Sequence, residues 1–195
     1  MREADTPIVD MLTLRRDLYF VMSLLLADKE VAKIPNVTDW TKAFHENEVR
    51  RLMLWVATAT RSLLGSFETK DTKKKDIEEK VCGEYWANFP KGEQKPLLFR
   101  QACNSAIHAT GIFPYKISEQ DYRTSLPWQG KSGSGSRKIP AGFDADRTVD
   151  QYSDRITIRS FSGGKTTRAH LDIIRFVQIT DTLINHFEEA DNANR

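Results

Sequence analysis

Cysteine is scarce in this sequence, with only Cys82 and Cys103 among 195 residues. The two lie far apart and show none of the short spacings that hold a metal ion or build a disulfide framework. Cysteine-rich secreted modules and zinc-binding modules are therefore excluded, and the sequence favours an intracellular, reducing setting. We expect neither a metal ion nor another cofactor.

Long hydrophobic runs are also missing. The most apolar segment, Leu18–Ala27, is too short to span a bilayer and has charged residues on both sides. It also lacks the small-residue cleavage pattern of a secretory signal. We expect a cytoplasmic protein with no membrane contact.

Charge of one sign does not dominate either. Hydrophobic residues make up 39% of the chain and charged residues 29%, and the formal net charge is only +2. This balance is typical of a globular protein and gives no electrostatic argument of its own for nucleic acid. The length suits a single domain over residues 1–195, with a polar tail at 189–195.

Three long segments with helical periodicity predict a mainly α fold. The first starts at Asp5-Thr6-Pro7 and runs to about 29–33, the second covers about 39–64 and stops at Gly65, and the last covers about 167–188. Helices of this length indicate a helical bundle. The residues predicted to face the core are Ile8, Met11, Leu12, Leu18, Met22, Leu25 and Leu26 in the first helix, Val49, Leu52, Met53, Val56, Ala59, Thr60, Leu63 and Leu64 in the second, and Ile173, Phe176, Val177, Thr180, Leu183, Ile184 and Phe187 in the last.

A small antiparallel β element and a flexible insertion are expected before the last helix. Alternating side chains in Arg155–Phe161 indicate a strand, whose partner is either Ile112–Ile117 or Val81–Trp86. The insertion covers about 118–154 and includes the glycine- and serine-rich stretch Gly130–Lys138, which is typical of a flexible loop.

One short helical segment, Leu97–Ala109, is the most informative part of the sequence. At 100° per residue, Arg100, Asn104 and His108 fall on one stripe of this helix. The segment therefore presents an arginine, an amide and an imidazole on a helix whose other side faces the core. That other side carries Leu98, Phe99, Ala102, Cys103, Ala106, Ile107 and Ala109.

These three side chains are a plausible minimal set for cutting a phosphodiester bond at a ribose 2′-hydroxyl. His108 can take or return a proton, Arg100 can stabilise charge on the phosphate, and Asn104 can orient one of them. The same residues also have a purely structural interpretation. In it, Asn104 and His108 hold the following loop, while Arg100 pairs with an acid on a neighbouring helix.

The segment Phe99–Ala109 resembles the motif helix of the HEPN superfamily, whose members are helical bundles with an Arg-x(4–6)-His motif on a late helix. The long second helix, with Glu48–Trp55 and Arg61–Leu64, is similar to the second helix of such proteins. The resemblance implies Arg100 and His108 as the catalytic pair with Asn104 as their polar companion. It also implies a homodimer in which two such pairs face one cleft.

Many HEPN proteins are metal-independent ribonucleases of toxin–antitoxin, CRISPR or phage-defence systems. The resemblance thus implies RNA binding or metal-independent RNA cleavage in a defence or stress system, with RNA, a second copy or another protein as the partner. Seven residues separate Arg100 from His108, against four to six in the motif. A non-catalytic protein–protein interaction domain with the same fold therefore stays open as the alternative.

Two further histidines are assigned to helix ends. His170 is placed near the start of the last helix, beside Lys165 and Arg168. At this position it is predicted either to contact a phosphate or to be part of the ordinary surface charge. His186 is placed in the last turn of that helix, where the helix dipole favours an imidazole.

Overall fold

The computed structural model describes residues 9–31, 39–67, 71–87, 89, 92–117, 151–162 and 165–193, and gives only the backbone for 27–31, 39–43, 114–117, 151–154, 162 and 165. Asp5–Pro7 and the stretch Gly130–Lys138 lie outside these residues. The first helix nevertheless does not start at Asp5–Pro7 as predicted, because Val9 and Asp10 are not helical and the side chain of Asp10 accepts a hydrogen bond from the backbone of Leu12 at 3.1 Å, at the start of the helix. The described chain forms five helices and five strands, in the order α1 (Met11–Val31), α2 (Asp39–Ser66), α3 (Thr72–Glu78), β1 (Val81–Trp86), β2 (Gln94–Leu98), α4 (Phe99–Ile107), β3 (Gly111–Ile117), β4 (Gln151–Ser162), β5 (Lys165–Asp172) and α6 (Ile173–Ala193).

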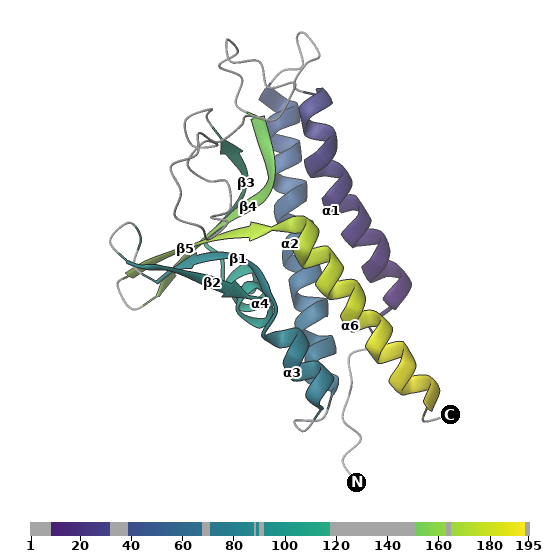
Figure 1. Ribbon diagram of the computed structural model, residues 1–195. Coiled ribbons are helices and arrows are strands. Elements are labelled where there is room, and N and C mark those ends of the chain that lie inside the picture. The colour runs from purple at the N-terminus through teal and green to yellow at the C-terminus, as the bar shows by residue number, and fades with distance from the viewer. Residues whose placement is uncertain are drawn as a thin grey trace, which may run out of the picture.

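The strands form one antiparallel sheet in the order β2-β1-β5-β4-β3 (Figure 1). Strands β4 and β5 are paired as far as Ser162↔Lys165. The two edge strands, β2 and β3, contain Pro96 and Pro114. Proline has no N–H to donate to a neighbouring strand, which explains why these two segments lie at the edges of the sheet.

The long helices α1, α2 and α6 lie on one side of the sheet, and α4 packs between the sheet and α2 (Figure 1). One cluster of buried side chains fills the space between the helices and the sheet. It confirms the predicted stripe of the second helix completely and most of that of the last. The buried members are Val49, Leu52, Met53, Val56, Ala59, Thr60, Leu63 and Leu64 from α2, Ile173, Phe176, Thr180, Leu183 and Ile184 from α6, and Ile156, Ile158, Ala169 and Leu171 from the sheet.

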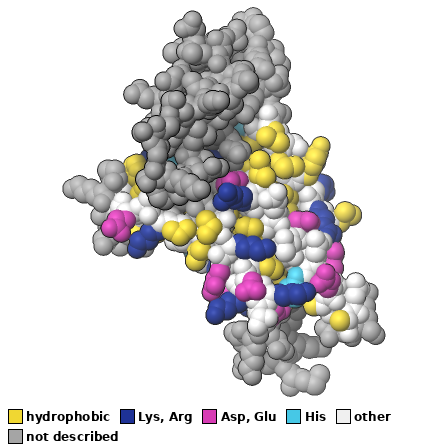
Figure 2. Space-filling model, in the orientation of Figure 1, with side chains coloured by type: hydrophobic (Ala, Val, Ile, Leu, Met, Phe, Trp, Pro, Cys, Tyr) yellow, Lys and Arg dark blue, Asp and Glu magenta, His cyan; other side chains and the backbone are white. Residues whose placement is uncertain are grey.

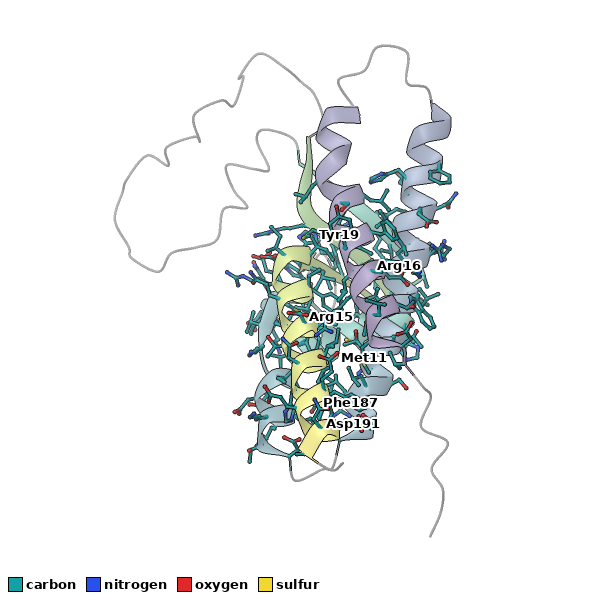
Figure 3. All side chains as sticks on the ribbon, turned by 90° about the vertical axis from the view of Figure 1, so that its right-hand side faces the viewer. Met11, Arg15, Arg16, Tyr19, Phe187 and Asp191 are labelled. Atoms are coloured by element: carbon teal, nitrogen blue, oxygen red, sulfur yellow. The ribbon has the colours of Figure 1, made fainter. Side chains whose placement is uncertain are left out.

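A polar contact fixes α1 against α6. Arg15 donates hydrogen bonds from Nη1 to Glu188 at 2.7 Å, from Nε to Asp181 at 3.3 Å and from Nη2 to Asn185 at 2.7 Å. Figure 3 shows Arg15 at the place where the two helices run side by side. One guanidinium thus satisfies three acceptors on a single face of α6.

The predicted core face of α1 is wrong in part. Leu12 is 77% exposed and Leu26 is 47% exposed, whereas the buried residues are Leu14, Leu18, Val21 and Leu25. Apolar side chains surround most of this helix, so two stripes fit the helical period about equally well. Only the packing against α2 and the sheet selects between them.

The fold is mixed α/β, and its sheet is larger than the small β element that the sequence predicts. The predicted strand Arg155–Phe161 lies within β4. Of its two predicted partners, Ile112–Ile117 pairs with it directly as part of β3. Val81–Trp86 is also a strand, but it pairs with β2 and β5.

Four further predicted boundaries are wrong. The polar tail predicted at 189–195 is helical as far as Ala193, where α6 ends. The last helix begins only at Ile173, because Lys165–Asp172 forms β5. The short helix begins at Phe99, because the two residues before it complete β2. The predicted insertion over 118–154 overlaps β4, which begins at Gln151. Strand β5 buries only Ala169 and Leu171 as apolar residues, too few to reveal a two-residue period.

None of the described helices combines the length and the apolar composition that crossing a bilayer requires.

Gly83 provides a direct test of how β1 meets β5. A Cβ atom at Gly83 would lie 2.1 Å from the backbone oxygen of His170. Because that oxygen belongs to the neighbouring strand, we predict that Gly83→Ala lowers the free energy of unfolding in urea by roughly 1–3 kcal/mol.

Gly65 offers a matched control, because it lies within α2 and nothing surrounds the position of its missing Cβ. We expect Gly65→Ala to raise the free energy of unfolding by up to about 1 kcal/mol, since alanine favours the helix. A Gly83→Ala protein as stable as the wild type would contradict the close approach of the two strands.

Candidate functional site around helix α4

The predicted stripe lies on α4, as expected from its helical spacing. Phe99, Ala102, Cys103 and Ala106 are buried, which confirms the predicted inward side of the helix. On the other side Arg100 and His108 are exposed and Asn104 is half-buried.

Arg100 is paired with a carboxylate. Its Nη1 donates to both oxygens of Glu78 in α3, at 3.1 and 3.2 Å. This is the acid on a neighbouring helix that the structural interpretation predicts. A phosphate bound at Arg100 would have to compete with Glu78, so Arg100 is a weaker anion contact than its exposure suggests.

Asn104 brings a second arginine to the stripe. The Nε of Arg61, in α2, donates to the side-chain oxygen of Asn104 at 3.1 Å. No carboxylate of the described residues forms an ion pair with Arg61, so its charge is not compensated there. Sequence reasoning missed Arg61 as a site residue, because its partner is 43 positions away and no local pattern connects them.

His108 caps the C-terminal end of α4. Its backbone N–H still donates to the carbonyl of Asn104 at 3.1 Å, so His108 lies one turn beyond Asn104. The loop that follows is held by Thr110, whose backbone N–H and hydroxyl both donate to the carbonyl of Arg159, at 2.8 and 3.2 Å. The loop-holding role that the structural interpretation gave to Asn104 and His108 therefore belongs at least in part to Thr110.

The two cysteines do not contribute a nucleophile. Burial raises the pKa of the Cys103 thiol to about 12, although the nearby charge of Arg61 acts in the opposite direction. Burial also raises the pKa of the Cys82 thiol far above its usual range. A thiol that stays protonated is a poor nucleophile and a poor metal ligand. Among the described residues no group of three His, Cys, Asp or Glu side chains could hold a metal ion.

His170 is a buried strand residue, which corrects both predicted roles at a helix start. Only 9% of it is exposed, and its ring meets the ring of Trp86 edge-on, with 4.9 Å between centroids. Burial, together with the charges of Arg168 and Arg155, lowers the pKa of His170 to about 4. The imidazole is therefore neutral at physiological pH and does not act as a cationic phosphate contact.

His186 is not in the last turn of α6, because the helix continues to Ala193. Its ring stacks on Phe67 with 4.7 Å between centroids, and its Nε2 lies 2.9 Å from the carboxylate of Asp71. Asp71 also caps α3 by accepting a hydrogen bond from the backbone of Lys74 at 3.0 Å. His186 thus joins α6 to the start of α3, a structural role.

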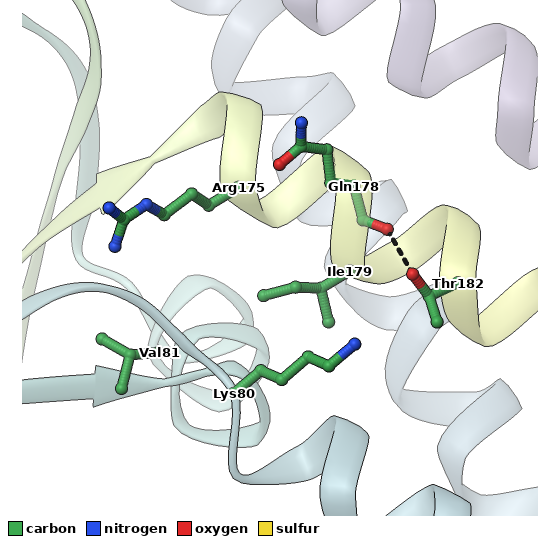
Figure 4. Close-up of a pocket in the computed structure, with 6 residues that line it drawn as sticks. All are labelled: Lys80, Val81, Arg175, Gln178, Ile179 and Thr182. Carbon is green, nitrogen blue, oxygen red and sulfur yellow. Dashed lines mark hydrogen bonds between the residues drawn. The ribbon is translucent and has the colours of Figure 1, made fainter.

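A shallow pocket of about 360 Å³ lies between the start of β1 and α6 (Figure 4). Lys80 and Arg175 border it, and Val81 and Ile179 form its apolar part. Arg175 is paired with Asp172 at 3.3 Å. Among the residues that line the pocket, no base lies next to a nucleophile.

No protein-family model matches this sequence, and comparison with curated proteins and with solved structures returns no significant match. The resemblance to HEPN proteins therefore stays a prediction, and the site has to be judged on its own geometry.

The buried imidazole of His170 predicts a pH dependence of stability. Its pKa is about 4 in the folded protein, against an ordinary value of 6.5. The unfolded chain binds a proton at a higher pH than the folded chain does, so stability is lost as the pH falls from about 6.5 towards 4. We predict that the free energy of unfolding decreases by roughly 2 kcal/mol between pH 7 and pH 5.

His170→Gln is the control, because glutamine does not titrate. The comparison uses the change of the free energy of unfolding with pH, so a different overall stability of the variant does not affect it. Carboxylates with a lowered pKa, such as Asp71, change their charge only at more acidic pH. They therefore do not contribute to the change in stability between pH 7 and pH 5. Urea titrations at several pH values measure the slope, and a slope unchanged in His170→Gln would show that another group is responsible.

Proposed function

We propose that this protein binds RNA and cleaves it without a metal ion, at the exposed side of α4. The observation that carries the proposal is the contact between Arg61 and Asn104. Arg61 has no carboxylate partner among the described residues, and it lies beside Asn104. Asn104 in turn precedes the exposed His108 by one helical turn.

Each side chain has a defined chemical role in this proposal. His108 takes the proton of the ribose 2′-hydroxyl, and the resulting alkoxide attacks the neighbouring phosphorus. The bond to the 5′-oxygen breaks, which leaves a 2′,3′-cyclic phosphate and, after uptake of a proton, a 5′-hydroxyl.

Arg61 stabilises the negative charge that develops on the phosphate. Among the described residues only Asn104 accepts a hydrogen bond from Arg61, through Nε, so both Nη groups are open there to two phosphate oxygens. Asn104 is the positioning residue for this guanidinium. Arg100, which the HEPN resemblance makes the phosphate contact, contributes less to RNA binding, because Glu78 already compensates its charge.

The HEPN-like helical bundle, the homodimer, the cytoplasmic location and the role in defence or stress remain part of this proposal. The supporting observations are the long helices α1, α2 and α6 and the position of the Arg100–His108 stripe on a later, short helix. Two buried free thiols, Cys82 and Cys103, support a reducing compartment.

Cleavage of a mixed, labelled single-stranded RNA pool in the presence of EDTA tests the proposal. We expect the wild type to cleave, and we expect His108→Ala and Arg61→Ala each to reduce the rate by roughly 100-fold or more, the usual cost of losing an acid–base group or an oxyanion contact. We expect Arg100→Ala to reduce it by less than about tenfold, because Glu78 already compensates this arginine.

Arg100→Ala is the matched control for Arg61→Ala, and circular dichroism checks that each variant is folded. Equal cleavage by the wild type and His108→Ala, or none by the wild type, would contradict the proposal and favour the interaction protein. A loss in Arg100→Ala as large as in Arg61→Ala would return the phosphate contact to Arg100.

A second function, a protein–protein interaction domain, is favoured by a specific surface. Leu12, Tyr19 and Leu26 follow one another at intervals of seven along α1 and are 77%, 61% and 47% exposed. Figure 2 shows hydrophobic side chains gathered over the part of the surface where α1 lies. Contiguous exposed apolar side chains on one helix face are typical of an interface.

We predict for this second function that the wild type is a homodimer in solution and that Tyr19→Glu is a monomer, as measured by light scattering after gel filtration. A charge on this face would have to be buried without a partner in the dimer. Leu54→Glu, at an apolar residue of α2 that is 44% exposed, is the control and should leave the mass unchanged. A wild type that is monomeric at all concentrations would contradict a dimer through α1.

A further inference from the structure

The face of the sheet turned away from the helices carries an unusual pair of charges. Alternate residues of β4 face the core, as Ile156 and Ile158 do, so Arg159 projects from the opposite face. Its direct partner across the antiparallel pair is Arg168 of β5. Two like charges in directly opposite positions destabilise a sheet.

Aromatic rings flank these arginines on the same face. Phe161, two residues beyond Arg159, is 64% exposed. Phe113 of β3 is paired with Thr157, is 39% exposed, and has the guanidinium of Arg159 at 5.4 Å from its ring centroid. The rings and the arginine form one row, Phe161–Arg159–Phe113, which we call the sheet platform.

Both arginines lie over rings. The guanidinium carbon of Arg168 is 3.6 Å from the ring centroid of Phe89, and that of Arg159 lies over Phe113. A guanidinium placed over a ring keeps its N–H groups directed outward. No described carboxylate forms an ion pair with Arg159. An anion on the platform would therefore meet, in Arg159, a guanidinium whose charge no described carboxylate compensates.

We propose that the sheet platform binds a single-stranded polynucleotide, with bases stacked on Phe161 and Phe113 and a backbone phosphate on Arg159. Exposed aromatic rings interleaved with arginine are the combination that recognises unpaired bases and their phosphates together. A base-paired duplex keeps its bases stacked inside and offers none to these rings. The inference rests on the proposed function only where it says that the bound strand is then cleaved, because binding and cleavage use different residues.

Continuity with α4 supports this occupant. Thr110, which bonds to the carbonyl of Arg159, is two residues beyond His108. The loop that carries His108 thus leads directly to the platform, around the edge strand β3. A strand bound on Phe161 and Arg159 would continue towards the side chains proposed to cut it.

Fluorescence anisotropy with a labelled 20-nucleotide 2′-O-methyl RNA tests the platform, because this probe lacks a free 2′-hydroxyl and is not cleaved. We expect Phe161→Ala to raise the Kd by about tenfold, the effect of losing one stacked base. Arg159→Ala should weaken binding and reduce the slope of log Kd against log salt by about 0.7, the value for one phosphate contact on a single strand.

Phe44→Ala is the matched control, since Phe44 is a phenylalanine of similar exposure, 62%, on α2. It should bind like the wild type, and Phe161→Trp should restore tight binding. A wild type that does not bind, a Phe161→Ala protein that binds like the wild type, or a duplex RNA bound as tightly as the single strand would each overturn the proposal. So would a poly-glutamate peptide that competes as well as RNA, because it would make the face an acidic-peptide site.

Single-stranded DNA of the same sequence distinguishes the two sources of the ligand. Weaker binding of DNA assigns the platform to RNA, and equal binding assigns it to unpaired strands of either kind. The failure of the platform is separable from the failure of the proposed function. A wild type that binds the probe but does not cleave RNA overturns the proposed cleavage alone, and unchanged binding in Phe161→Ala overturns the platform alone.

Discussion

The pairing of β1 with β5 is the constraint on which the rest of the structure depends. It joins the hairpin-like pair β1 and β2 to the three strands β3, β4 and β5, which lie far from it in the sequence. Only glycine at position 83 allows the backbone of His170 to approach this closely. The same pairing places Glu84 next to His170, and the ion pair of Glu84 with Arg155, at 3.6 Å, then spans β5. A long-range contact of this kind has a large entropic cost of loop closure, which the apolar core beneath the sheet offsets.

How much could be predicted from the sequence depended on how many core residues an element carries. The second helix has eight inward residues at helical spacing, all of them buried, and its stripe was identified correctly. Strand β5 has only Ala169 and Leu171, so it was absorbed into the predicted last helix. In α1 the opposite problem arose, since Leu12 and Leu26 belong to a second apolar stripe that local periodicity does not distinguish from the buried one. The stripe of α4 was placed correctly, but its partners Glu78 and Arg61 come from elements that no local pattern links to it.

The small net charge conceals a division among the arginines that bears on function. Arg15, Arg51 and Arg100 each have a carboxylate within 3.3 Å, and solvent screens such exposed pairs so that they add little to stability. Arg61 and Arg159 have instead an amide oxygen and an aromatic ring as their described contacts. A guanidinium held in place without a counter-charge is pre-organised for an anion, because little side-chain freedom remains to be lost on binding. The two arginines of this kind, and not the total charge, are the reason to consider RNA.

These two arginines lie on opposite sides of the sheet, and the loop after α4 connects them. Ser160 points to the core side, where its hydroxyl approaches the carbonyl of Ser105 in α4 at 3.5 Å, while its neighbours Arg159 and Phe161 point away. Because β3 is an edge strand, a polymer on the outer face needs to pass only this edge to reach the helix. The hydrogen bonds from Thr110 to Arg159 fix the loop at that edge. A flexible single strand can follow such a turn, whereas a stiff duplex cannot, so the proposed separation of binding from cleavage would also favour a single-stranded substrate.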